Sequence, residues 1–382
     1  MFDNSDSAVS LLKDLIAIPS VNPTDKEVIE GIYGDDSIAE YISHWFRKRS
    51  LDVEIQNVSD GCHNVVVHIP GKNRNKCTVF CAHMDTVDIE NMKIDPFDPK
   101  EIDGRIFGRG SCDDKASLSA MMVAFHAIAD NQAPENDLVF LASGGEEFNM
   151  RGAEYFINNN SYNIDGVIVG EPTNLRLISA HKGGIRQEII TRGVSAHSST
   201  PELGVNPIYK MAKIINLIED YSNQLMNSAP HPLLKTETIV CSIVNAGKLS
   251  NTIPDECRSV VDWRIHPGKK EKACKEKLYN FLKMNTDADF EFGKTIFTSP
   301  METASDNCMV RKMLKENWKY VSQESPEGAT YGTDGSKFYL NNIPAVVIGP
   351  GDIAQAHTKD EFVEITQIEK AIEIYKSYIS NL

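Results

Sequence analysis

The sequence predicts an α/β protein, with a mostly parallel sheet flanked by helices and a smaller inserted α+β domain. Short apolar runs at residues 78–82, 138–142 and 166–169 alternate with helical patterns, which is typical of a parallel sheet covered on both faces. From about Ser179 the pattern becomes strand, helix, strand, strand, helix, strand, the order of a ferredoxin-like domain. After about Thr298 the first pattern returns, so the first domain is expected to be discontinuous.

The expected first domain comprises residues 1–178 and 295–382, and the inserted domain residues 179–294. A chain of 382 residues is long enough for two domains. In the first domain, strands are predicted at residues 53–55, 64–69, 78–82, 138–142, 166–169 and 345–348, and helices at residues 7–18, 37–49, 116–129, 152–158, 307–320 and from 366. In the inserted domain, strands are predicted at residues 185–190, 237–244 and 259–265, and helices at residues 207–221 and 269–282.

The composition excludes several classes of partner. A net charge of −15 argues against nucleic acid and anionic membrane surfaces, because no basic stripe is available to neutralise phosphates. No apolar run approaches the ~20 residues that span a bilayer, and residues 1–6 lack the features of a signal peptide. The eight cysteines have no regular spacing, which favours free thiols. We therefore expect a cytoplasmic protein without disulfides.

A His and an Asp follow the apolar run at residues 78–82. Side chains at positions i and i+2 of an extended backbone point the same way, so His83 and Asp85 leave the strand end on one face. A carboxylate placed behind an imidazole can fix its tautomer and raise its basicity for metal binding. The simpler alternative is a His that is hydrogen-bonded to a nearby turn.

Further metal-ligand candidates follow other predicted elements: Asp113, Glu147, Glu171 and His357. Imidazole and carboxylate ligands suit zinc, cobalt or manganese. The absence of a Cys pair argues against a closed structural zinc site. Two imidazoles and three carboxylates serve two ions if one carboxylate bridges them. In the adjacent pair Glu146-Glu147, one carboxylate can bind metal while its neighbour takes a proton from the attacking water.

Each candidate also has a simpler interpretation. Asp113 could cap the helix that follows it, and Glu146-Glu147 could begin a helix on which the dipole favours acids. Glu171 could be a turn residue, and His357 could cap a loop. Because ligands collect beyond the carboxyl ends of parallel strands, the coincidence of these residues at strand ends favours one shared site.

The same residues carry a family resemblance. The matching motifs, in order, are His83-Met84-Asp85-Thr86-Val87, Gly108-Arg109-Gly110-Ser111-Cys112-Asp113-Asp114-Lys115, Gly145-Glu146-Glu147, Gly170-Glu171-Pro172, and Gly349-Pro350-Gly351 leading to Ala356-His357-Thr358. The chain resembles the acetylornithine deacetylase and succinyl-diaminopimelate desuccinylase family of dinuclear zinc hydrolases, relatives of aminoacylase and carboxypeptidase G. The resemblance covers nearly the whole chain and implies a zinc-exopeptidase-like catalytic domain with an inserted lid and dimerisation domain.

The resemblance also implies roles at a co-catalytic centre of two zinc ions per subunit, for which Co²⁺ or Mn²⁺ can substitute. Asp113 resembles the bridging ligand. His83 and Glu171 would hold one ion, and Glu147 and His357 the other. Asp85 resembles the residue that orients His83, and Glu146 the general base.

In the inserted domain, the segment around His197 is similar to one whose His reaches the site of a neighbouring subunit to stabilise the oxyanion, which implies a homodimer. Asn251 resembles a substrate-contacting residue, and Arg264 an Arg that binds the substrate carboxylate. The simpler interpretations are an ordinary loop His and a structural salt bridge. Gly332 and Thr333 resemble part of the family's substrate loop.

The motifs leave the register and the substrate open. Where the family usually has Met or Thr after the bridging Asp, then Lys and Gly, this chain has Asp114, Lys115 and Ala116. The ligand could therefore be read as Asp114, although the Gly-Arg-Gly spacing favours Asp113. The segment ending at His357 resembles acetylornithine deacetylase, whereas residues 332–335 resemble the desuccinylase.

We expect an enzyme that removes the acyl group from a small N-acyl amino acid, in first place an acetylornithine deacetylase-like enzyme. The alternatives are succinyl-diaminopimelate desuccinylase and a dipeptidase or carboxypeptidase. An alternative of another class is a non-catalytic binding protein on the same fold. It predicts that Glu146 or a ligand is lost, and none is missing.

Overall fold

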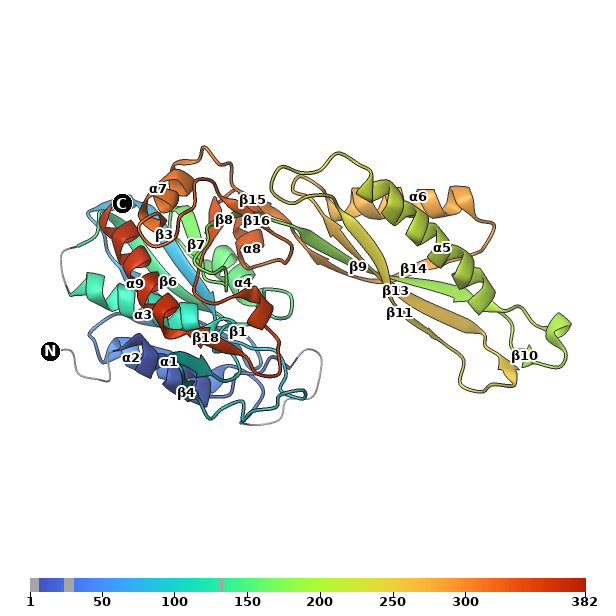
Figure 1. Cartoon of the computed structure of the whole chain (residues 1–382), viewed down its shortest axis with the longest axis horizontal. Coiled ribbons are helices and arrows are strands. Elements are labelled where there is room, and N and C mark those ends of the chain that lie inside the picture. Colours follow the sequence, from blue (N-terminus) through green and yellow to red (C-terminus); the bar gives the residue numbers. More distant parts are fainter. Residues whose placement is uncertain (1–6, 24–30, 131–132) are drawn as a thin grey trace. The chain divides into compact units, whose positions relative to one another are not determined.

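The computed structural model describes residues 7–23, 31–130 and 133–382. The N-terminal residues 1–6, on which the expectation about a signal peptide rests, lie outside this part. The chain forms two compact units: unit 1 contains residues 1–179, 302–327 and 333–382, and unit 2 contains residues 180–301 and 328–332. The predicted fold class, an α/β domain interrupted by a ferredoxin-like insertion, is confirmed (Figure 1).

The larger sheet has the strand order β1-β2-β6-β3-β7-β17-β8-β15, with β16 paired to β8. Its strands are β1 (Val53–Ser59), β2 (Cys62–Ile69), β3 (Asn73–His83), β6 (Asn136–Ser143), β7 (Ile164–Val169), β8 (Ile178–His181), β15 (Met301–Glu302), β16 (Glu327–Ala329) and β17 (Ala345–Val347). The neighbours β6, β3, β7 and β17 are parallel, whereas β1 and β2 add an antiparallel edge. The carboxyl ends of the four parallel strands therefore meet at one edge.

Helices cover both faces of this sheet (Figure 1). One face carries α2 (Asp36–Arg47) and α3 (Lys115–Ala129). Against α3 pack α1 (Ala8–Ala17) and α9 (Ile365–Ser380), and α7 (Cys308–Asn317) packs against α9. The other face carries α4 (Arg151–Asn159) and α8 (Gly335–Leu340). Phe80 of β3 and Phe140 of β6 are paired across the sheet and therefore point to the same face. On that face both rings pack on Phe125 of α3. Because α3 lies between the sheet and other helices, it is apolar nearly all round.

A small antiparallel sheet lies beside the site, in the order β18 (Phe362–Glu364), β5 (Arg105–Phe107), β4 (Lys100–Ile102). The turn between β4 and β5 contains Asp103 and Gly104, a dipeptide that favours two-residue hairpin turns, and both residues have positive φ. Phe362 pairs with Phe107, and Val363 with Ile106. This pairing attaches a segment near the C-terminus to the loop that precedes α3.

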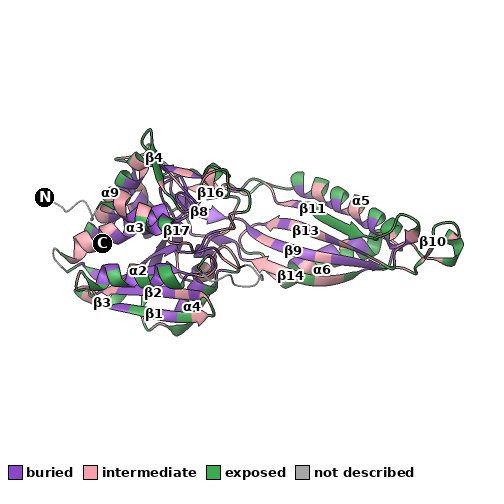
Figure 2. Ribbon diagram, turned by 90° about the horizontal axis from the view of Figure 1, so that it is seen from below, coloured by how far each residue is buried: buried purple, intermediate pink, exposed green. Residues whose placement is uncertain are grey.

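Unit 2 is an antiparallel sheet in the order β11-β13-β9-β14 with two helices on one face (Figures 1 and 2). Its elements are β9 (Gly183–Arg192), β10 (Ala196–His197), the 3₁₀ turn η2 (Pro201–Leu203), α5 (Pro207–Met226), β11 (Thr238–Ala246), β12 (Thr252–Ile253), β13 (Glu256–Ile265), α6 (Glu271–Asn285) and β14 (Glu291–Thr298). Residues of β13 alternate between buried and partly exposed, and buried Trp263 packs edge-on against Tyr221 of α5. The opposite face bears ion pairs such as Arg258 with Glu188.

The inserted unit extends beyond residue 294, where its end was expected. β14 continues to Thr298 because its residues pair with β9, up to Thr298 opposite Gly184, and unit 2 ends at Met301. The short segment 328–332 also belongs to unit 2. Strands of two or three residues, such as β15 and β16, have too little pattern to be read from the sequence.

All eight cysteines are free, as predicted, and six of them are buried. Within residues 7–23, 31–130 and 133–382, no helix combines the length and apolar composition needed to cross a bilayer.

Candidate metal centre

The four parallel strands deliver polar side chains to their shared edge. His83 is the last residue of β3, and Glu171 follows β7 by two positions. Glu147 lies in the turn after β6, and His357 follows β17 by way of a 3₁₀ turn, η3 (Ile353–Gln355). Asp113 comes from the loop between β5 and α3. Four residues that are far apart in the sequence thus arrive at one place because the sheet is parallel there, and Asp113 joins them from its loop.

The carboxylate of Asp113 lies between two imidazoles. Its Oδ1 is 3.0 Å from Nε2 of His83, and its Oδ2 is 3.3 Å from Nε2 of His357. The same His357 nitrogen is 3.3 Å from Oε2 of Glu147. Each Asp113 oxygen therefore faces a different potential ligand, which is the arrangement that a bridging carboxylate requires.

Ligand atoms gather into two overlapping groups. His83, Asp113 and Glu147 offer atoms within 4.8 Å of one another, and so do His83, Glu146 and Glu171. Glu146 was expected as a base rather than a ligand, and the structure places it within reach of both roles. Asp114, the alternative register, is fully buried beside Gly170 and Ser117, so Asp113 is the residue that faces the imidazoles.

The protonation properties of this cluster show an excess of negative charge. Burial raises the pKa of Glu171 well above its ordinary value, and the charges of Glu146 and Asp113 add to the effect. Burial also raises the pKa of Glu146, to which Asp334 and Glu147 contribute further. Such a cluster needs a compensating positive charge.

The neighbouring carboxylates favour the protonated form of both imidazoles. Burial alone would lower the pKa of His83, but the hydrogen bond and the charge of Asp113 raise it well above the ordinary value. Hydrogen bonds to Asp113 and Glu147 raise the pKa of His357 to about 10. Oε1 of Glu147 is buried and has no hydrogen-bond partner among the described residues. Carboxylate oxygens and imidazole nitrogens, one of them an orphaned buried atom, suit divalent metal ions.

Asp85 supports the cluster from behind, by a different contact from the expected one. Nδ1 of His83 donates to the backbone carbonyl of Asp85 at 2.8 Å, whereas the Asp85 carboxylate is 3.7 Å away. That carboxylate instead accepts the backbone N–H groups of Glu146 at 3.0 Å and Glu147 at 3.1 Å, and the side-chain amide of Asn22 at 2.7 Å. Asp85 thus fixes the tautomer of His83 and the turn that carries both glutamates.

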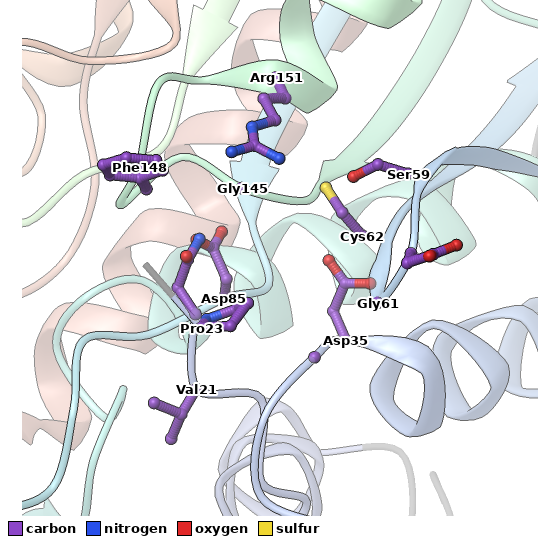
Figure 3. A pocket seen from close by; sticks show the side chains of 13 residues that line it. Val21, Pro23, Asp35, Ser59, Gly61, Cys62, Asp85, Gly145, Phe148 and Arg151 are labelled. Carbon is purple, nitrogen blue, oxygen red and sulfur yellow. The ribbon is translucent and has the colours of Figure 1, made fainter. Parts of the chain in front are cut away.

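Asp85 also lines a cavity of about 190 Å³ (Figure 3). Asp35, Phe148 and Arg151 also line it. Burial raises the pKa of Asp35 to about 6, against the effect of its hydrogen bond with His63, and the charge of Asp85 adds to the rise. None of the five expected metal ligands lines this cavity.

Residues that the sequence did not single out complete the site. Asp334, next to the expected Thr333, is buried, and its carboxylate accepts the hydroxyl of Ser143 at 2.5 Å. Glu361 is fully buried and binds the loop of Asp113. Asp334 lies within residues 332–335, which resemble the family's substrate loop, so a sequence signal for it existed, whereas Glu361 lies in none of the motifs.

The expected substrate residues are divided between the units. His197, Asn251, Arg264 and Gly332 belong to unit 2, and Thr333 to unit 1. His197 is exposed, and β10 pairs it with Thr252 opposite the loop that carries Asn251. The guanidinium of Arg264 binds Asp262 of its own strand at 2.7 Å, the salt bridge that was the simpler interpretation. Thr333 is fully buried, and its hydroxyl accepts the N–H of Gly335.

Residues 79–381 match the sequence pattern described as Peptidase family M20/M25/M40. The chain is 29% identical over 383 residues to acetylornithine deacetylase of Proteus mirabilis (strain HI4320), covering 98% of this chain and 96% of the relative. It is 27% identical over 405 residues to the probable succinyl-diaminopimelate desuccinylase of Staphylococcus aureus (strain MSSA476), covering 96% and 95%.

The fold is similar to that of a solved M20 family metallo-carboxypeptidase from Sulfolobus solfataricus. The TM-score is 0.78 at 20% sequence identity, and the match covers 99% of each chain. At this identity the likeness concerns the fold. The expected family resemblance is confirmed by the match over residues 79–381.

Proposed function

The chain belongs to Peptidase family M20/M25/M40, and we propose that it is a zinc-dependent enzyme that removes the acyl group from an N-acyl amino acid. Family membership makes the chain a hydrolase that acts on amide bonds. The observation that carries the proposal is the position of Asp113 between His83 and His357, with Glu146 beside them.

The proposed centre takes two zinc ions per subunit. Asp113 would bridge them, with His83 and Glu171 on one side and Glu147 and His357 on the other. The ions would polarise the scissile carbonyl and make the attacking water more acidic. The distances of 3.0 and 3.3 Å from the two oxygens of Asp113 to two different imidazoles support this division of the ligands.

Glu146 is the proposed general base. Its backbone is fixed through the N–H bond to Asp85, and burial raises its pKa well above the ordinary value of a carboxyl. A carboxylate of raised basicity takes the proton of the attacking water more readily, and its acid form can then protonate the leaving amine nitrogen. The charge of Asp334 contributes to that raised pKa.

The proposed substrate is a small N-acyl amino acid with a free carboxylate, with N-acetylornithine as the first choice. The full-length match to an acetylornithine deacetylase supports this choice. The match to a probable succinyl-diaminopimelate desuccinylase is almost as extensive, and supports the N-succinyl substrate as the second candidate. Arg264 can serve as carboxylate receptor only if it exchanges Asp262 for the substrate.

We also propose that the enzyme is a homodimer in which His197 acts on the partner's active site. β11 is an edge strand of unit 2 among the described residues. It exposes three apolar side chains: Val240, Ile243 and Val244. An apolar edge strand offers unpaired backbone groups for another chain, and burying it in a dimer would remove this liability.

The test is amine release from N-acetylornithine, N-succinyl-diaminopimelate, simple N-acetyl amino acids and dipeptides, with zinc added and after chelation. Chelator-sensitive release that strongly favours one N-acyl amino acid is the expected result. Preferential release from a dipeptide would replace the deacylase proposal by a peptidase. Absence of release from every substrate, with metal bound, would contradict the proposal.

A further inference from the structure

Glu361 is a carboxylate buried in the middle of the loop that presents Asp113. It is 0% exposed. Its Oε1 accepts the backbone N–H of Cys112 at 2.8 Å and that of Asp113 at 3.0 Å. Its Oε2 accepts the N–H of Gly110 at 3.0 Å and the guanidinium of Arg109 at 2.7 Å. Both oxygens are thus occupied by two donors each, and all four donors belong to one loop.

The same residue is joined to the segment of the second imidazole. Glu361 follows His357 by four positions and directly precedes β18, which is paired with β5. Its backbone carbonyl accepts the N–H of Gly108 at 3.1 Å. His357 itself has a positive φ of 62°, a conformation that a residue with a side chain holds only when its surroundings fix it. Glu361 thus joins the segment that follows His357 to the loop that carries Asp113.

A carboxylate is the one side chain that satisfies these donors. A glutamine of the same shape presents an N–H₂ group in place of one oxygen, which would face two N–H donors and accept neither. It would also leave Arg109, whose side chain is 4% exposed, as a buried cation without its carboxylate. Replacement of Glu361 thus removes bonds from the Asp113 loop without touching any metal-facing atom.

We propose that Glu361 is a positioning residue of the metal centre, which sets the separation between Asp113 and His357 and so the affinity for the ion that they share with Glu147. The inference rests on the proposed metal-binding function. It predicts that the ion between Asp113, Glu147 and His357 depends on Glu361 more than the ion near His83 and Glu171. Residues that orient metal ligands in this manner typically change metal affinity by about 10- to 100-fold.

The test is a titration of the metal-free chain with Co²⁺ in which binding is monitored by the visible absorption of the bound ion. It is carried out on wild type, Glu361→Gln and Glu361→Asp. The shorter Asp keeps the charge beside Arg109 but cannot reach the N–H groups of Cys112 and Asp113 at the same time. Both variants should bind the ion of Asp113, Glu147 and His357 about 10- to 100-fold more weakly, with an altered absorption band for that ion. Because Asp113 would also contact the ion near His83 and Glu171, that ion should show a smaller loss of affinity.

Glu316→Gln is the matched control. Glu316 is also buried in unit 1 and is 2% exposed. Its carboxylate accepts hydrogen bonds from the ammonium group of Lys319 at 2.8 Å and from the hydroxyl of Ser377 at 2.6 Å. It contacts no part of the metal centre through these bonds. Its replacement should lower the thermal unfolding temperature of the metal-free protein while both Co²⁺ affinities stay at the wild-type value.

Three outcomes would overturn the inference. Either Glu361 variant could bind both ions with wild-type affinity. The Glu316 variant could lose affinity equally, which would make the effect one of general stability. Both Glu361 variants could fail to fold while the control folds, so that Glu361 would serve the fold rather than the ligands. Failure of the metal proposal itself would differ from all three, because wild type would then not bind two ions.

Discussion

Oδ2 of Asp113 and Nε2 of His357 lie 3.3 Å apart, although one residue precedes α3 and the other follows η3 near the end of the chain. The opposite oxygen of Asp113 faces His83. The chain brings these groups together by joining β5 to β18 and by placing four parallel strand ends at one edge. The proposed two-metal centre depends on that convergence.

Metal binding should release protons. In the metal-free protein the pKa of His357 is raised to about 10 by its hydrogen bonds to Asp113 and Glu147, so the imidazole is protonated at pH 7.5. A ligand imidazole must be neutral, and metal affinity should therefore rise with pH up to about that pKa. Isothermal titration calorimetry in two buffers of different ionisation enthalpy measures the protons released. A binding heat that does not depend on the buffer would contradict this prediction.

Replacement of Glu146 should separate metal binding from turnover. Glu146→Gln removes the proposed proton acceptor and leaves the ligands in place, so kcat should fall by roughly 10²- to 10⁴-fold. Metal content measured by elemental analysis should stay at the wild-type value. Glu369→Gln, an exposed change on α9, should alter neither quantity. Wild-type turnover by the Glu146 variant would remove Glu146 from the role of base.

Disruption of the β11 edge should produce a monomer of low activity. Ile243 is 49% exposed, and Ile243→Lys would place a charge in the proposed dimer contact. Sedimentation velocity should show one subunit instead of two, with a loss of turnover similar to that of His197→Ala. Met284→Lys on α6, where the side chain is 84% exposed, is the control. A monomer with full turnover would contradict the role of His197 across subunits.

The fold should lose stability in mild acid through His181. This residue is fully buried, its Nδ1 donates to the carbonyl of Lys182 at 3.0 Å, and burial lowers its pKa to about 4. The unfolded chain, with a pKa near 6.5, takes up the proton first. The free energy of unfolding therefore falls as pH decreases below 6.5, by about 2 kcal/mol at pH 5.

The measurement is urea unfolding of the metal-free protein at pH 7.5 and pH 5, for wild type and His181→Gln. The variant cannot titrate at this position, so its free energy of unfolding should decrease less between the two pH values. An equal decrease in both proteins would show that His181 does not contribute.

Much of the fold and of the candidate site could be predicted because local patterns carried the information. Apolar runs such as residues 138–142 of β6 indicate a parallel sheet covered on both faces, and parallel strands place their carboxyl ends at one edge. The residues Glu147 and Glu171 follow directly from that rule. Alternating burial along β13 likewise shows a sheet with helices on one face only.

The remainder depends on contacts between distant segments. Nothing near Glu361 in the sequence indicates that its carboxylate binds the loop at Asp113, because β18 is three residues long. The Asp85 carboxylate was expected to accept the hydrogen bond of His83, but the backbone carbonyl of Asp85 accepts it. The carboxylate instead accepts two N–H groups of the turn after β6. Such choices among acceptors are decided by packing and leave no periodic signal.

Anomalous diffraction at the zinc absorption edge, from crystals of the active protein, shows how many zinc ions the centre holds and which residues lie beside each. We predict two peaks on opposite sides of the Asp113 carboxylate, one beside His83 and Glu171 and the other beside Glu147 and His357. A single peak in a fully active enzyme, or zinc bound away from Asp113, would contradict the two-metal account.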